Sequence, residues 1–225
     1  MKFLVVADIH GEHENLTNIL NNAPKDMDFI ICPGDFTDMY NIPQGFSQLN
    51  IADIILQKLL AANKQVFCVP GNHDPYEILE LFDEYNTNIH NKVKKYKGVE
   101  LAGWGGAPTP FNTIFEPTEE ETKESLARLG SKINNRFILV LHNPPKNTKL
   151  DLVAAGKHVG SQAARDFILD KKPVLVISAH IHEARGIDKL GDSVLFYPGE
   201  ATKGYYGIVT IEGQDIKCEL KKAKT

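Results

Sequence analysis

Histidine, aspartate and asparagine residues recur in this sequence directly after short apolar runs. In the segment Val66–Asp74, apolar residues are followed by Pro-Gly and then by Asn72, His73 and Asp74. Because Pro and Gly stop a strand and turn the backbone, we expect these polar side chains at the end of a strand. Asn, Asp and Gly are also common turn residues, so this segment alone is equally compatible with an ordinary turn.

The same arrangement occurs at four other places in the chain. In an open α/β sheet, ligands bind beyond the carboxyl ends of buried strands, so residues that follow five such strands are expected to meet in one crevice. Histidines and carboxylates cluster in this way at metal and catalytic sites. We therefore predict one site that also receives Asp8 and His10, Asp35, His142, and His180 and His182.

The types of these side chains indicate the chemistry of the predicted site. Carboxylate, imidazole and amide ligands without thiolate suit Mn, Fe or Zn. There are too many candidate ligands for one ion, so we expect two divalent metal ions. Two such ions about 3.5–4 Å apart need a bridging carboxylate and stabilise an in-line displacement at phosphorus. A net positive charge at the site would attract a phosphate group.

The elements that must position these residues are strands and helices in alternation. Helical spacing of apolar residues is found at Glu12–Asn22 and Ile51–Ala62, and Ser161 can cap a helix that extends to about Asp170. Thr118 and Glu121 form a predicted capping box for a surface helix that ends at Gly130. The remaining expected features are a hairpin at Val93–Gly103, a strand-rich tail at Val194–Leu220 and long loops at 39–48 and 104–117.

The composition is that of an ordinary globular protein. The 225 residues have a formal net charge of −4 and 42% hydrophobic residues, and we interpret residues 1–225 as one domain. The acidic balance argues against nucleic acid as a partner. No apolar run is long enough to span a membrane, and the chain begins with a strand-like run instead of a signal peptide, so we expect a cytoplasmic protein.

These motifs together resemble a known family. The set Asp8-x-His10, Gly34-Asp35-x-x-Asp38, Gly71-Asn72-His73-Asp74, His142 and His180-x-His182 resembles the calcineurin-like metallophosphoesterases, over residues 3 to about 200. The segments His182-Glu183 and Tyr197-Pro198-Gly199 also resemble small microbial members. The resemblance implies an α/β fold with two packed mixed β-sheets flanked by helices, which is a four-layer α/β/β/α sandwich.

The resemblance also implies a role for each site residue. The first metal ion would be held by Asp8, His10, Asp35 and His182. The second would be held by Asp35, Asn72, His142 and His180, with Asp35 as the bridge. His73 would be the general acid that protonates the leaving oxygen, oriented by Asp38, and a hydroxide bridging the metals would attack phosphorus directly.

Two departures from the family pattern bear on the substrate. The residue before His180 is Ala179, where the family usually has Gly, and this adds only a methyl group. The phosphate-gripping arginines of the protein serine/threonine phosphatases are replaced by Met39 and by Asp74-Pro75. We therefore predict a phosphodiesterase that acts on a small phosphate ester, such as a nucleotide, in preference to a phosphoprotein.

Three residues are further candidates for contact with substrate. Asn72 is one, and His158 and Ser161 are the others because they precede a predicted helix whose N-terminus would favour an anion. A helix cap explains Ser161 equally well. Trp104, Phe111 and Phe115 either wall the pocket or anchor their loop on the core.

Two alternative functions are compatible with the sequence. One is a nuclease that acts on single strands or on ends, and the other is a non-catalytic, metal-organised module that binds a nucleotide. The presence of both His73 and Asp38 favours catalysis. The sequence does not select an oligomeric state, and a homo-oligomer is compatible with it.

Overall fold

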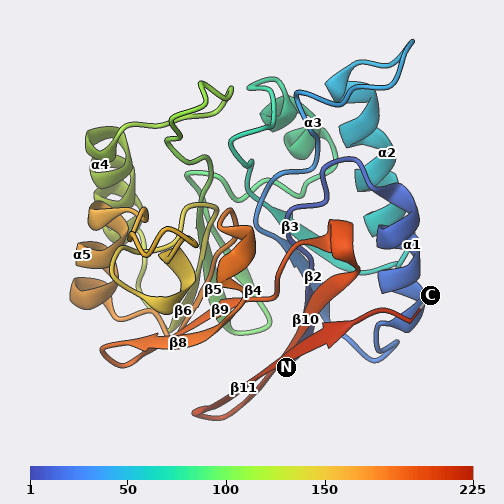
Figure 1. The fold of residues 1–225 in the computed structure, drawn as a ribbon. Coiled ribbons are helices and arrows are strands. Elements are labelled where there is room, and N and C mark those ends of the chain that lie inside the picture. Colours follow the sequence, from blue (N-terminus) through green and yellow to red (C-terminus); the bar gives the residue numbers. More distant parts are fainter. Residues whose placement is uncertain (225) are drawn as a thin grey trace.

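The computed structural model describes residues 1–224 and contains two β-sheets packed face to face (Figure 1). The five-stranded sheet has the order β11 (Asp215–Lys222), β10 (Tyr205–Glu212), β1 (Lys2–Val5), β2 (Phe29–Cys32) and β3 (Gln65–Cys68). The six-stranded sheet has the order β4 (Val93–Tyr96), β5 (Val99–Trp104), β6 (Phe137–Leu141), β7 (Leu175–Ile177), β9 (Ser193–Tyr197) and β8 (Gly186–Leu190).

Strand direction decides where the ends of the central strands lie. β1, β2 and β3 are parallel to one another, and so are β5, β6, β7 and β9. The antiparallel strands β10, β11, β4 and β8 occupy the margins of the sheets. In each sheet the carboxyl ends of the parallel strands therefore lie along one edge.

Helices cover the two outer faces, so the predicted architecture of two mixed sheets flanked by helices is confirmed (Figure 1). Apolar side chains of the helices pack on one sheet face each and form two separate clusters. The five-stranded sheet is covered by α1 (His13–Asn22), α2 (Gln48–Leu60) and α3 (Ile78–Glu84), and the six-stranded sheet by α4 (Glu119–Gly130) and α5 (Gln162–Lys171). None of these helices is long and apolar enough to cross a bilayer.

A third apolar core fills the space between the sheets. Phe3 and Phe29 stack with ring centroids 4.5 Å apart, and Phe196 enters the same cluster from the opposite sheet. All three side chains are fully buried. Since strands buried on both faces read as continuous apolar runs, this core explains why the sequence shows little alternation there.

The structure differs from the sequence prediction mainly at element boundaries. α2 begins at Gln48 instead of Ile51, because Ser47 and Asn50 form a reciprocal capping box. β8 was not predicted; it is a half-exposed edge strand that pairs with β9. The hairpin at β4 and β5 and the Thr118–Glu121 capping box are present as predicted.

Candidate metal centre

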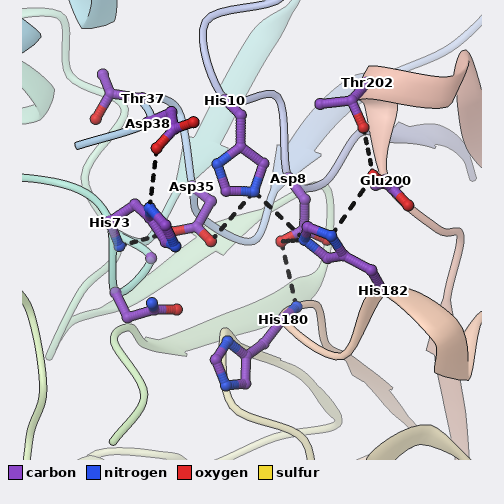
Figure 2. A network of polar contacts seen from close by, with 12 residues as sticks. Asp8, His10, Asp35, Thr37, Asp38, His73, His180, His182, Glu200 and Thr202 are labelled. Atoms are coloured by element: carbon purple, nitrogen blue, oxygen red, sulfur yellow. Dashed lines mark hydrogen bonds and ion pairs between the residues drawn. The ribbon is translucent and has the colours of Figure 1, made fainter. Parts of the chain in front are cut away.

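Predicted site residues that follow strands of both sheets come together in space. Figure 2 shows Asp8, His10, Asp35 and His73 near His180 and His182. Asp8 and His10 follow β1, Asp35 follows β2, and Asn72 and His73 follow β3. The six-stranded sheet provides His142 after β6, and His180 and His182 after β7. The connections after five strands thus converge from both sheets.

Six of these residues form three overlapping groups of three. Within each group, the potential ligand atoms all lie within 4.8 Å of one another. The groups are Asp8, His10 and His182; His10, Asp35 and His73; and Asp8, Asp35 and His142. Such spacing is compatible with ligand bonds of about 2.0–2.2 Å to shared cations.

The contacts between donor atoms fit a divalent cation. The Nε2 atoms of His10 and His182 lie 3.3 Å apart, and His10 Nε2 lies 3.6 Å from Asp35 Oδ2. Two imidazole nitrogens that face each other need a shared proton or a cation between them. The oxygen and nitrogen donors, without thiolate, suit Mn, Fe or Zn.

Four of the predicted ligands have a left-handed backbone. The φ angles are 50° for Asp8, 47° for His10, 54° for Asp35 and 77° for His180. Non-glycine residues rarely adopt this conformation, and it persists where surrounding structure enforces it, often at functional sites. Here the amides of Ile9 and His10 both donate to the Asp35 carbonyl, at 2.8 and 2.9 Å.

Two glycines allow the loops after β2 and β3 to cross closely. A Cβ atom on Gly71 would lie 2.0 Å from Asp35 Oδ1, and one on Gly34 would lie 2.6 Å from the Gly71 backbone nitrogen. No side chain fits at either position. The Pro-Gly pairs that end these strands therefore bring Asp35 beside the segment that carries Asn72 and His73.

Asp35 and His142 form a buried electrostatic pair. His142 Nε2 lies 3.5 Å from Asp35 Oδ2, and both side chains are almost completely buried. Burial alone would lower the pKa of His142, but Asp35 raises it to about 9. Burial likewise opposes ionisation of Asp35, yet His142 holds the pKa of this carboxyl below its ordinary value. A metal ion bound here would displace the proton from His142.

Asp8 and His142 connect the two sheets. Tyr197 Oη, at the end of β9, donates to Asp8 Oδ2 at 2.6 Å, and His142 Nδ1 lies 2.8 Å from the Pro33 carbonyl oxygen. Tyr197 was not predicted as a site residue. The sequence did carry a signal, since Tyr197 precedes a Pro-Gly pair like those that follow β2 and β3.

Glu200 is a second residue that sequence reasoning missed. Its Oε2 lies 3.5 Å from His182 Nδ1, on the ring edge opposite the nitrogen that approaches His10. Lys203 and Thr202 hold the Glu200 carboxylate in place. A carboxylate beside the far nitrogen of a histidine fixes the ring for metal binding. Figure 2 shows Glu200 on the side of the His182 ring that faces away from His10.

His73 belongs to one of the three metal-ligand groups and has Asp38 next to it. Its backbone N–H donates to Asp35 Oδ1 at 2.9 Å, and its Nδ1 lies 3.4 Å from Asp38 Oδ1 (Figure 2). The buried Nδ1 has no well-aligned hydrogen-bond partner within residues 1–224. Burial lowers the pKa of His73, and Asp35 opposes this shift.

Asn72 and His180 contact His142. Asn72 Oδ1 lies 2.9 Å from His142 Nε2, and its amide donates to Thr113 Oγ1 at 3.1 Å. The His180 ring lies 5.1 Å from that of His142, and burial lowers the pKa of His180 to about 3. His180 belongs to none of the three groups found in residues 1–224, so its role as a ligand stays a prediction.

His158 and Ser161 have structural partners. His158 Nδ1 lies 2.7 Å from the buried Asp151 carboxylate. Ser161 is buried and caps α5 by accepting a hydrogen bond from the Ala164 amide at 3.0 Å. These contacts account for both residues in the fold, and contact with substrate stays a prediction for each.

A sequence model described as calcineurin-like phosphoesterase matches residues 1–184 of the chain. The chain belongs to this family. Calcineurin-like phosphoesterases are metal-dependent, which agrees with the donor groups described above.

Two sequence relatives and one solved structure match most of the chain. An uncharacterized protein of Methanocaldococcus jannaschii is 35% identical over 213 residues, 92% of this chain and 90% of its own length. A Fibrobacter succinogenes protein described as a probable cyclic nucleotide phosphodiesterase is 25% identical, over 85% of this chain and 72% of its own. A crystal structure from Thermus thermophilus shares the fold, with a TM-score of 0.74, 20% identity and coverage of 97% and 98%.

Asp74 holds the loops after β2 and β3 together, a role that the sequence did not reveal. Its fully buried carboxylate accepts hydrogen bonds from the amides of Gly71 at 2.8 Å, Thr37 at 3.0 Å and Phe36 at 3.2 Å. Burial and the nearby Asp35 raise the pKa of Asp74 to about 6.

We predict that Asp74→Ala lowers the free energy of unfolding by about 3–5 kcal/mol, because it leaves several buried donors without an acceptor. Urea denaturation of metal-free protein measures this. Asp83→Ala is the control: Asp83 is 56% exposed and pairs only with Lys92, so a change below about 1 kcal/mol is expected. Equal effects of the two substitutions would contradict the role of Asp74.

Proposed function

We propose that this protein is a phosphodiesterase that uses two divalent metal ions, Mn, Fe or Zn. The observation that supports the proposal is the pairing of His73 with Asp38 at the edge of three overlapping groups of potential metal ligands, one of which includes His73 itself. A site that only binds a cation has no need of an imidazole–carboxylate pair next to it. Hydrolysis needs such a pair, because a proton must reach the leaving oxygen.

The metal ions would be held as the family pattern implies. Asp8, His10, Asp35 and His182 would hold the first ion, and Asp35, Asn72, His142 and His180 the second, with Asp35 between them. When bound, such cations act as Lewis acids on water and on the phosphoryl group. Glu200 and Tyr197 would fix the orientation of His182 and Asp8.

The remaining chemistry belongs to His73 and Asp38. His73 would carry a proton and donate it to the oxygen of the departing alcohol. Asp38 stabilises the charged imidazole and orients it, and the Tyr40 amide, which donates to Asp38 Oδ1 at 2.9 Å, restrains Asp38 in turn. Loose contact between His73 and Asp38 is typical of an enzyme before substrate binds.

The walls of the site favour diesters over monoesters. A cavity of about 310 Å³, here called the catalytic cavity, is lined by nine residues that include His10, Asp38, His73 and His182. None of the nine is Lys or Arg. A phosphate monoester carries a second negative charge, and proteins commonly meet that charge with arginine. A diester carries one negative charge, so it requires fewer positively charged side chains.

Turnover of bis(p-nitrophenyl) phosphate is expected to exceed turnover of p-nitrophenyl phosphate by at least tenfold in kcat/KM. The two compounds share a leaving group and differ in charge, so the ratio reports recognition at phosphorus. Each metal is added separately to chelator-treated protein, and release of nitrophenol is measured. Preference for the monoester would contradict the proposal.

Asp35→Asn is expected to reduce metal affinity at least tenfold and to abolish most activity, because the amide cannot bridge two cations. Metal content after dialysis and Mn titration by calorimetry measure the loss. Asp38→Asn is the matched control, with the same chemical change three residues away: it should retain the metal and lose only rate. If Asp35→Asn binds metal like wild type, the bridging role is wrong.

His73→Ala is expected to keep both metal ions while losing rate in a way that depends on the leaving group. The loss should be about 10²–10⁴-fold for phenol or alkyl alcohol leaving groups, which need a proton, and much smaller for nitrophenol. Lys123→Ala, at a residue of α4 whose side chain is 70% exposed, serves as control. Equal losses for all leaving groups would show that His73 is not the general acid.

A further inference from the structure

A second cavity of about 620 Å³ opens beside the catalytic cavity. We call it the side cavity. Its walls include His10, Glu12 and Asn41, and these residues also line the catalytic cavity. The two cavities therefore adjoin each other at His10, which belongs to two of the metal-ligand groups.

The side cavity has an apolar floor, and part of this floor is exposed instead of packed in the core. The floor consists of two side chains from the loop before α2 and three from α2 itself: Pro43, Phe46, Ile51, Ile54 and Ile55. Phe46 is 50% exposed and Ile54 is 38% exposed, so neither is buried by the protein itself. Small-molecule sites are concave, mostly apolar and of about this volume.

The charges around the side cavity argue against a second phosphate group. Glu12 and Glu14 lie in its wall together with one cation, Lys58. The Lys58 ammonium already donates to Thr17 Oγ1 at 3.0 Å. A polyphosphate or a continuing nucleotide chain would meet more negative than positive charge here, whereas a neutral apolar group would not.

The position of the side cavity indicates which part of a substrate would enter it. His73 and Asp38 line the catalytic cavity but not the side cavity, whereas His10 lines both. If His73 protonates the leaving oxygen, the leaving alcohol departs on the His73 side. The group on the His10 side is then the one that stays on phosphorus.

We propose that the side cavity binds an apolar ester group that remains on phosphorus, so that the substrate is a phosphodiester with one apolar substituent. This inference rests on the proposed phosphodiesterase function. Hydrolysis breaks the P–O bond on the His73 side, water supplies the new oxygen, and the leaving oxygen takes the proton. The products are an alcohol and an apolar phosphate monoester.

A series of p-nitrophenyl alkyl phosphates tests the proposal, because the leaving group is constant and only the retained chain changes. From methyl to butyl, KM should fall about twofold for each methylene, roughly half the effect of full burial. The value of kcat should stay within about twofold. A KM that does not change with chain length overturns the inference, and if the methyl ester is still hydrolysed, the proposed function is unaffected.

Ile54→Glu places a carboxylate in the floor and should abolish the dependence of KM on chain length. The new side chain is four residues before Lys58, a spacing that supports the helix. Leu49→Glu is the matched control on the same helix: Leu49 is 36% exposed and does not line the side cavity. It should retain the full dependence, and loss in both variants would overturn the inference.

Binding of butyl phosphate, measured by calorimetry, decides the question independently of turnover. Wild type and Leu49→Glu should bind butyl phosphate at least fivefold more tightly than methyl phosphate, and Ile54→Glu should bind the two equally. Equal binding by wild type overturns the inference. If no diester is hydrolysed with Mn, Fe or Zn, the proposed function fails, and this measurement still reports on the side cavity.

Discussion

The hydrogen bonds to Asp8 join the two sheets where their carboxyl edges meet. Asp8 follows β1, yet Tyr197 and the backbone of His180, both from the six-stranded sheet, donate to its carboxylate. His142 makes the reciprocal connection from β6 to the Pro33 carbonyl oxygen. Because two of the three metal-ligand groups draw residues from both sheets, the distances within those two groups depend on this contact.

A buried contact of this kind is favourable only when its charges are compensated. Asp8, Asp35, Asp74 and His142 are all nearly inaccessible to solvent. Buried carboxylates are costly, and burial together with the charge of Asp35 raises the pKa of Asp74. Protons, backbone amides and cations are the available counter-charges. Phosphoesterase chemistry uses cations as the counter-charges. The crowding of buried carboxylates, which is unfavourable for the fold, therefore favours metal binding.

Two loops next to the candidate metal centre lie outside the family motifs. Loop 39–47 carries Tyr40 beside the His73 ring and Phe46 at the floor of the side cavity. Loop 104–117 is held to Asn72 by two backbone hydrogen bonds, from Ile114 and Phe115, and it presents Thr113 to the Asn72 side chain. Loop 39–47 thus borders both cavities, whereas loop 104–117 supports Asn72.

The sequence by itself determined the strands, most helices and the residues that gather at the strand ends, because Pro-Gly pairs, apolar runs and capping boxes act over a few neighbouring residues. It did not reveal Asp74 as the tie between two loops, Glu200 behind His182, or β8 at the sheet edge. Those features depend on segments that are distant in the chain and become neighbours only when the sheets pack. The contact between Tyr197 and Asp8 spans 189 residues, and local patterns carry no measure of such a distance.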